Sequence, residues 1–270
     1  QTCALPISLF SDGSNIQRKP KGHLYLYPLI AIAAMLAIVF VMDLPHMHKP
    51  KQQLSQTIRI PAGQRAQMDL PDGSVVWLNS QTTLTYDENF GKKDRKVTLD
   101  GEAYFEVAHN KEIPFYVQTE NIKVQVTGTK FDVCSYKGSN SFIARLIEGS
   151  INLLTNNAKE EKPITSLTKG KYFSMENGKY KTGEMSSNNA LAWMQGIYYF
   201  DDVPFKELLD KIALYYNYKI TVKNPKILEN YRCTGKFKDL DGIEHILKVI
   251  QKDHPFKYNI DNEHNKITIE

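Results

Sequence analysis

The sequence predicts a single transmembrane helix, then an all-β, sandwich-like domain, then a small α+β domain with two helices. Three observations lead to this prediction. Residues 24–42 are apolar and uncharged, residues 57–181 hold short alternating runs between turn signals, and residues 190–270 mix strand patterns with helical periodicity. With 270 residues, of which 41% are hydrophobic, the chain can form one large domain or two modest ones.

The apolar run LYLYPLIAIAAMLAIVFVM at residues 24–42 is the candidate membrane helix. A helix of this length rises about 28 Å, close to the roughly 30 Å hydrocarbon core of a bilayer. Tyr25 and Tyr27 stand at one end, where amphipathic rings favour the interface. A buried core helix and a cleavable signal peptide are the alternatives. The second lacks a small-x-small cleavage site, because DLPH follows the run.

Residues 1–23 are predicted to be a short cytoplasmic tail. Arg18, Lys19 and Lys21 precede the apolar run and Lys49 and Lys51 follow it, so the positive-inside tendency favours a cytoplasmic N-terminus only slightly. The residues ALPI at 4–7 are also what one reading frame of a widely used sequencing adapter encodes. We therefore expect residues 1–7 to be adapter read-through and the native N-terminal region to be missing, which resequencing of the locus tests.

After a linker at residues 43–56, alternating apolar and polar residues predict an all-β domain at 57–181. Asp72-Gly73 and Asn177-Gly178 are hairpin turn signals. No convincing helical periodicity occurs here, which favours a sandwich or a related closed sheet. The predicted strands cover residues 66–70, 75–78, 97–100, 103–107, 115–118, 122–127, 131–136, 142–147 and 150–154.

A polar linker at residues 182–189 precedes the last predicted domain, residues 190–270. Two amphipathic helices are predicted at residues 204–216 and 241–251, because their apolar residues recur at i, i+3, i+4 and i+7. These apolar positions are Phe205, Leu208, Leu209 and Ile212 in the first helix, and Ile243, Ile246, Leu247 and Ile250 in the second. The predicted strands cover residues 197–200, 218–222, 232–237, 256–260 and 266–269, the last two forming a hairpin.

The residues do not predict an enzyme, a cofactor or a metal site. Glu102 and Glu106 are the best carboxylate pair, but a strand would separate them by about 13 Å, whereas glycosidases need roughly 5 to 9.5 Å. We expect both on a solvent-facing side of a strand. His46 and His48 lie in the predicted linker, where two ligands are weak evidence for a metal.

The cysteines and the net charge likewise do not predict a cysteine-based site or a nucleic-acid partner. Cys3, Cys134 and Cys233 form no closely spaced pair, and the last two are expected to be small strand residues. The net charge is +4, without a basic stripe interleaved with aromatic residues. This pattern does not favour direct binding of nucleic acid.

One bond, Gly128–Thr129 in VTGTKFDV, is a candidate for self-cleavage. A threonine hydroxyl can attack the preceding carbonyl carbon when the backbone is suitably strained, giving an ester that then hydrolyses. Glycine before threonine permits unusual backbone angles and leaves the carbonyl open. The alternative is an ordinary Gly-Thr pair at a strand edge, and the residues alone favour that alternative.

Several long runs resemble one known family. RIPAGQRAQMDLPDGSVVWLNSQTTLTY (59–86), VTLDGEAYFEVAHNKEIPFYV (97–117), VQVTGTKFDV (124–133) and LIEGSINL (146–153) resemble the FecR family of transmembrane sigma-factor regulators (anti-sigma factors). The tail, with YYFDDVPFKELLDKIALYYNYKI and CTGKF, is similar to the domain of unknown function that often follows FecR domains. That domain in turn resembles small domains at the N-termini of secretins and TonB-dependent transporters.

This resemblance implies a single-pass inner-membrane protein with a cytoplasmic N-terminus and a periplasmic C-terminal bulk. The cytoplasmic part would hold an extracytoplasmic-function (ECF) sigma factor. The periplasmic part would sense the signalling domain of a TonB-dependent outer-membrane transporter, and site-specific proteases would act in the release of the sigma factor. Some members of the family cut themselves at a Gly-Thr bond that matches Gly128–Thr129.

The chain departs from the family pattern at its beginning. Family members usually carry some dozens of helical residues before the span, whereas this chain has residues 1–23. We therefore expect that the segment that grips the sigma factor is incomplete here.

Two other classes of protein remain as alternatives. A membrane-anchored periplasmic glycan-binding or glycan-cleaving β-sandwich could stack sugars on Trp77 and the tyrosines, although aromatic residues more often fill sheet cores. A structural module that bridges the membrane and secretion machinery is the other. Neighbouring genes for a sigma factor and a transporter would favour regulation over both.

Overall fold

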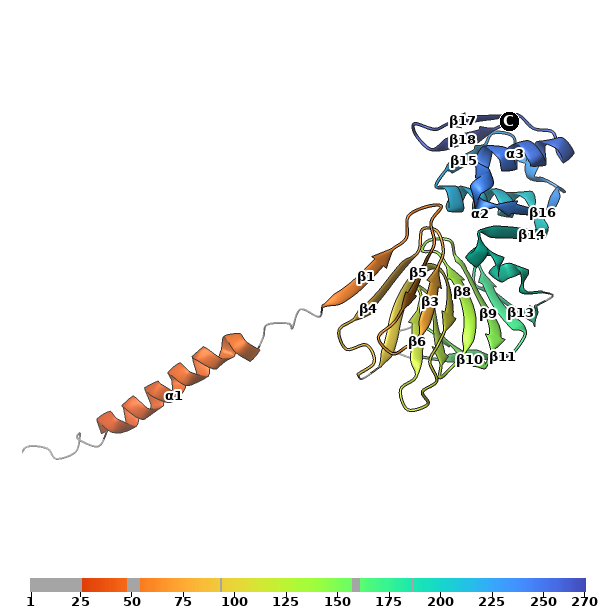
Figure 1. The fold of residues 1–270 in the computed structure, drawn as a ribbon. Helices are drawn as coiled ribbons and strands as arrows, with labels where there is room; N and C mark the ends of the chain where they lie inside the picture. Colours follow the sequence, from red (N-terminus) through yellow and green to blue (C-terminus); the bar gives the residue numbers. More distant parts are fainter. Residues whose placement is uncertain (1–25, 48–53, 93, 157–160, 186) are drawn as a thin grey trace, which may run out of the picture. The chain divides into compact units, whose positions relative to one another are not determined.

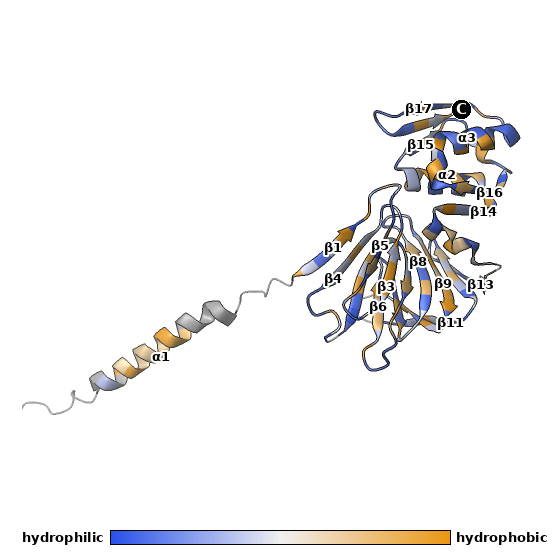
Figure 2. Cartoon of the chain, in the orientation of Figure 1, coloured by the Kyte–Doolittle hydropathy of each residue, from blue (hydrophilic) through white to orange (hydrophobic). Residues whose placement is uncertain are grey.

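The computed structural model describes residues 26–47, 54–92, 94–156, 161–185 and 187–270. The chain divides into two units, residues 1–52 and residues 53–270, which are described separately. The first unit contains one helix, α1 (Leu26–Met47) (Figure 1). Its large apolar side chains within residues 30–40 are between 56% and 69% exposed, and Figure 2 shows the same turns as the hydrophobic part of the helix.

The helix predicted at residues 24–42 is therefore present over most of that range and continues to Met47. In the described part of the chain, no helix reaches both the length and the hydropathy that a membrane span requires. The structure thus confirms a helix here without identifying it as a span. His46 falls in α1 and not in the predicted linker, whereas His48 lies outside the described residues.

Thirteen strands make up the β lobe, residues 55–184. They are β1 (Ser55–Arg59), β2 (Ala66–Asp69), β3 (Val75–Leu78), β4 (Thr83–Asp87), β5 (Arg95–Glu106), β6 (Phe115–Gln118), β7 (Ile122–Val126), β8 (Lys130–Ser135), β9 (Ser141–Glu148), β10 (Ser150–Thr155), β11 (Pro163–Thr168), β12 (Lys171–Glu176) and β13 (Lys179–Glu184).

Strand β5 belongs to both halves of the curled sheet. Its first half pairs with β4 and β6, and its second half pairs with β3 and β8. One half-sheet therefore has the order β1-β4-β5-β6-β7-β10-β11, and the other has β2-β3-β5-β8-β9-β12-β13. The predicted all-β, sandwich-like domain is confirmed as a sheet that curls around one core.

The bend between the two halves of β5 falls at Gly101. This residue has a φ of +134°, and a Cβ atom there would lie 2.4 Å from the Thr82 side-chain oxygen, so only glycine fits. Thr82 Oγ1 also accepts a hydrogen bond from the Glu102 amide at 3.0 Å. The sequence predicted two strands at residues 97–100 and 103–107. That prediction was wrong about the break, because the glycine bends one continuous strand.

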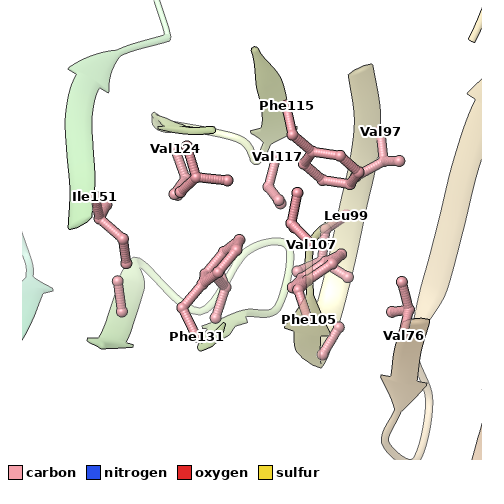
Figure 3. Close-up of a cluster of buried hydrophobic side chains, with 14 of the residues drawn as sticks. Val76, Val97, Leu99, Phe105, Val107, Phe115, Val117, Val124, Phe131 and Ile151 are labelled. Atoms are coloured by element: carbon pink, nitrogen blue, oxygen red, sulfur yellow. The ribbon is translucent and has the colours of Figure 1, made fainter. Parts of the chain in front are cut away.

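The core of the β lobe lies between the two half-sheets and follows the period of two expected for strands. Phe105 and Phe131 stack at 5.1 Å between ring centroids, and Phe115 meets Phe105 edge-on at 5.9 Å. Figure 3 shows these rings with the valines that surround them. Each of the three phenylalanines is completely buried.

The sequence missed several peripheral strands. β1, β11 and β13 carry mostly exposed or half-exposed residues, so they lack the alternation on which the predictions relied. β4 and β12 were also missed, although their burial alternates. The hairpin turn predicted at Asn177-Gly178 is confirmed, since both residues have positive φ between β12 and β13. The predicted linker at 182–189 was too long, because β13 extends to Glu184 and a 3₁₀ helix, η1 (Asn188–Gln195), follows.

The C-terminal lobe, residues 187–270, has the predicted two helices. α2 (Phe205–Tyr216) and α3 (Gly242–Asp253) bury all eight of the apolar residues predicted for their inner faces. Its strands are β14 (Ile197–Pro204), β15 (Lys219–Val222), β16 (Arg232–Lys238), β17 (Tyr258–Asp261) and β18 (Lys266–Ile269). β14 pairs with β16, and β18 lies between β15 and β17, so the small α+β domain is confirmed.

Candidate functional site

The Gly128–Thr129 bond lies where the chain crosses from one half-sheet to the other, between β7 and β8. The segment that follows β5 runs alongside it. The Val107 amide donates to the Thr129 carbonyl at 3.0 Å, and the Asn110 amide donates to the Thr127 carbonyl at 2.7 Å. Thr129 is 4% exposed. The candidate bond is therefore part of an ordered crossover between the end of β7 and the start of β8.

His109 packs directly on Gly128. A Cβ atom at residue 128 would lie 2.3 Å from His109 Nδ1 and 2.8 Å from the His109 Cα, which no real side chain tolerates. The φ of Gly128 is outside the left-handed region. Glycine is therefore required here by the close approach of His109, and not by the unusual backbone angle that the sequence suggested.

Gly149 approaches the same bond from a second crossover, between β9 and β10. Its φ is +93°, and a Cβ atom there would lie 2.9 Å from both the Gly128 carbonyl oxygen and Thr129 Oγ1. Thr129 Oγ1 donates a hydrogen bond to the Ser150 carbonyl at 3.0 Å. The threonine hydroxyl and the carbonyl oxygen of the bond that it would cleave thus both lie against the same glycine.

Buried Arg95 holds the segment that carries His109. Its guanidinium donates to the carbonyls of Ala108 at 2.7 Å and Asn110 at 3.2 Å, the two residues that flank His109. A third bond goes to the Ile113 carbonyl at 2.7 Å. Arg95 is 2% exposed and is neutralised by the Asp72 carboxylate at 3.0 Å. This ion pair therefore fixes the backbone on both sides of His109.

A cavity of about 340 Å³ opens beside this segment. Asp72, Phe90, Arg95, His109 and Ile113 are among the residues that line it. His109 itself is exposed. Water can therefore reach the imidazole, whereas the Thr129 side chain is shielded from solvent.

A second group of buried charges lies across β5, β8 and β9. Arg145 Nη1 is 2.6 Å from Asp132 Oδ2 and 3.8 Å from Glu102 Oε1. Glu102 also accepts a hydrogen bond from Asn79 Nδ2 at 2.6 Å. Burial, reinforced by the nearby Asp132 charge, raises the pKa of Glu102 to about 7, and burial also raises the pKa of Asp132.

The structure corrects one expectation about these carboxylates. Glu102 was expected on a solvent face, but it is 4% exposed, because the bend at Gly101 turns this part of β5 inward. Glu106 instead contacts the Tyr104 hydroxyl at 3.3 Å and Lys130 at 3.7 Å. The two glutamates therefore engage different partners.

The β lobe contacts the C-terminal lobe at the end of α2. Gly63 N and Ser80 Oγ each donate to the Tyr215 carbonyl at 3.1 Å, and Gln81 donates to the Leu214 carbonyl. The last carbonyls of a helix lack partners within the helix. The β lobe thus supplies hydrogen bonds to two of the last carbonyls of α2.

The other candidates do not gather into a site. Trp77 is half-buried and packs against the core, with its ring centroid 5.4 Å from that of Tyr104. Cys134 and Cys233 are free thiols in β8 and β16, as expected of small strand residues, and Cys3 lies outside the described residues. No group of three metal-binding side chains occurs among the residues that the structure describes.

The sequence did not point to His109 or Arg95. Arg95 stands in the charged run GKKDRK, which looks like a solvated turn, and His109 follows a strand without a periodic pattern. Their positions become apparent only in the fold, where the Arg95 side chain binds backbone carbonyls beside His109 and the His109 side chain contacts Gly128.

Comparisons with known proteins cover both lobes. The family described as FecR protein matches residues 56–152, and the family described as FecR, C-terminal matches residues 197–269. Among curated proteins, none matches the chain. Two crystal structures of a candidate anti-sigma factor from Parabacteroides distasonis are similar to it, with a TM-score of 0.68 each and 25% and 24% identity. Each alignment covers 80% of this chain and 98% of the other.

Replacing Arg95 by alanine is expected to destabilise the protein strongly. The change leaves Asp72 buried without its partner and removes three bonds to carbonyls, and breaking a buried ion pair costs about 3–5 kcal/mol. Urea denaturation of the full chain in detergent measures this loss. Arg232→Ala is the control, because its pair with Asp202 is exposed, and its effect should be much smaller. Equal losses in the two variants would contradict the role assigned to Arg95.

Glu102 is expected to make stability depend on pH. The unfolded chain releases this proton near its ordinary pKa of 4.5, but the folded protein keeps it up to about pH 7. Between these values the folded state binds more protons, so the free energy of unfolding falls as pH rises, by on the order of 3 kcal/mol. Glu102→Gln should flatten the decrease between pH 5 and 8, leaving the contribution of Asp132, whose pKa burial also raises.

Denaturation curves at several pH values test this, with Glu176→Gln at the exposed end of β12 as the matched control. An unchanged slope in Glu102→Gln would show that the buried carboxyl is already ionised at pH 5.

Proposed function

The chain belongs to the FecR family, and we propose that it is an anti-sigma factor that binds an ECF sigma factor and sets its activity in response to an envelope signal. One observation carries the proposal. The FecR family matches the β lobe, and the FecR C-terminal family matches the C-terminal lobe. A candidate anti-sigma factor shares this fold over 98% of its own length. This function requires partner recognition and no turnover of a substrate.

The proposed arrangement places residues 24–42 across the inner membrane, with the N-terminus in the cytoplasm and both lobes in the periplasm. Its support is the uncharged sequence of these residues and the exposure of the apolar side chains of α1. Exposed apolar side chains are stable in lipid, whereas their exposure to water costs free energy. The sigma factor would bind on the cytoplasmic side of this helix.

The proposed signal enters through the C-terminal lobe, which would contact the signalling domain of a TonB-dependent outer-membrane transporter. Among the described strands, β15 and β17 each pair on one side only, with β18. An extended partner segment can add to such an edge by main-chain hydrogen bonds. A single helix transmits a conformational change poorly through lipid, so we propose that site-specific proteases complete the release of the sigma factor.

Co-purification tests the main proposal. The native protein encoded at the locus should remain in membranes after a carbonate wash and should carry an ECF sigma factor with it. Ala34→Arg, in the middle of the apolar run, should release much of the chain, since a charge at the centre of a span costs about 2.5–3.5 kcal/mol. Lys51→Arg outside the run is the control. A native protein that is washed off the membranes, or that retains no sigma factor, would contradict this function.

We propose that self-cleavage between Gly128 and Thr129 belongs to the same pathway. The support is that Gly149 lies close both to the Thr129 hydroxyl and to the Gly128 carbonyl oxygen. Mass spectrometry of the expressed chain should find a fragment that begins at Thr129. Thr129→Ala should abolish this fragment because it removes the nucleophile, whereas Thr127→Ala should leave it. Only intact wild-type chain would reject self-cleavage while leaving the proposed regulation of a sigma factor untouched.

A further inference from the structure

Cleavage by Thr129 requires two proton movements that the threonine cannot make alone. Its hydroxyl must lose a proton to become a good nucleophile, and the Thr129 nitrogen must gain one to leave the Gly128 carbonyl carbon. In the structure, the hydroxyl proton is directed to the Ser150 carbonyl oxygen. A backbone carbonyl is too weak a base to accept that proton, so another group must do so.

The charged side chains next to this crossover are already paired with one another. Lys130 Nζ lies 3.7 Å from Glu106 Oε2 and 4.0 Å from Glu148 Oε2. Arg95 is enclosed by Asp72 and by three carbonyls. A guanidinium cannot act as a base, because it stays protonated in proteins.

His109 differs from these groups in both position and chemistry. Its imidazole nitrogen Nδ1 lies where a side chain of Gly128 would begin, directly against the residue whose bond would break. Imidazole changes its charge between pH 5 and 8, and can therefore both accept and return a proton under physiological conditions.

We propose that His109 is the proton-transfer residue of self-cleavage at Gly128–Thr129. This inference rests on the proposed self-cleavage and adds to it the group that moves the protons. His109 would act directly or through one water molecule from the adjoining cavity of about 340 Å³.

The reaction balances with water as the sole co-reactant. Thr129 Oγ1 attacks the Gly128 carbonyl carbon while its proton passes to the His109 imidazole. The carbon–nitrogen bond then breaks, and the imidazolium gives that proton to the departing Thr129 nitrogen. The product is an ester between Gly128 and Thr129 with a free amine. Water then splits the ester into a Gly128 carboxylate and a Thr129 hydroxyl, and the proton released goes to the new amine of Thr129.

The fold holds His109 in place without enclosing it. The Val107 and Asn110 amides pair with the Thr129 and Thr127 carbonyls, and Arg95 binds the carbonyls on either side of His109. The backbone is thus fixed against the bond while the ring stays exposed to water. A residue that served only to fill space would not need this exposure.

The test follows the appearance of the fragment that begins at Thr129 after cell-free synthesis of the full chain in detergent micelles. His109→Ala should slow cleavage by at least about 100-fold, the lower range for general acid–base catalysis. Added imidazole should restore part of the rate.

Two further variants complete the experiment. His109→Asn keeps a polar side chain of similar size and should be as slow as His109→Ala, which separates proton transfer from packing. His245→Ala changes an exposed histidine of α3 and should cleave at the wild-type rate. Cleavage of His109→Ala at the wild-type rate would overturn the role of His109 and leave self-cleavage standing. A wild-type chain that never yields the fragment would overturn both.

Discussion

The bend of β5 at Gly101 is the constraint on which the rest of the β lobe depends. One strand of twelve residues serves as a neighbour of β4 and β6 before the glycine, and of β3 and β8 after it. The close contact with Thr82 leaves no space for a side chain at this point. Because both half-sheets share this strand, they enclose one core, in which Phe105 can stack on Phe131.

The bend also determines which side chains become chemically unusual. After Gly101 the strand turns Glu102 into the interior, where Asn79 and Arg145 partly compensate its charge. The same strand then delivers the segment with His109 to the crossover at Gly128. The buried carboxyl and the exposed imidazole are thus two consequences of one backbone feature.

The sequence predicted the parts of the fold that local pattern controls. The two helices of the C-terminal lobe were predicted because four apolar residues on each recur at helical spacing and are buried. Polar edge strands such as β13 were missed, because no burial imposes alternation on them. The Gly128–Thr129 bond could be singled out from its residue types, but Arg95, His109 and Gly149 could not. Their roles arise from contacts between segments that are distant in sequence, and no local pattern records such contacts.

The way in which the β lobe holds α2 has a consequence for how this protein can diversify. Gly63, Ser80 and Gln81 donate hydrogen bonds to the main-chain carbonyls of Leu214 and Tyr215. These hydrogen bonds do not involve the side chains of the helix. Exchanging the outward-facing residues of α2, such as Lys206 and Asp210, therefore leaves these attachment points intact. Gene duplicates could acquire new binding preferences on this helix while keeping the same junction between the lobes.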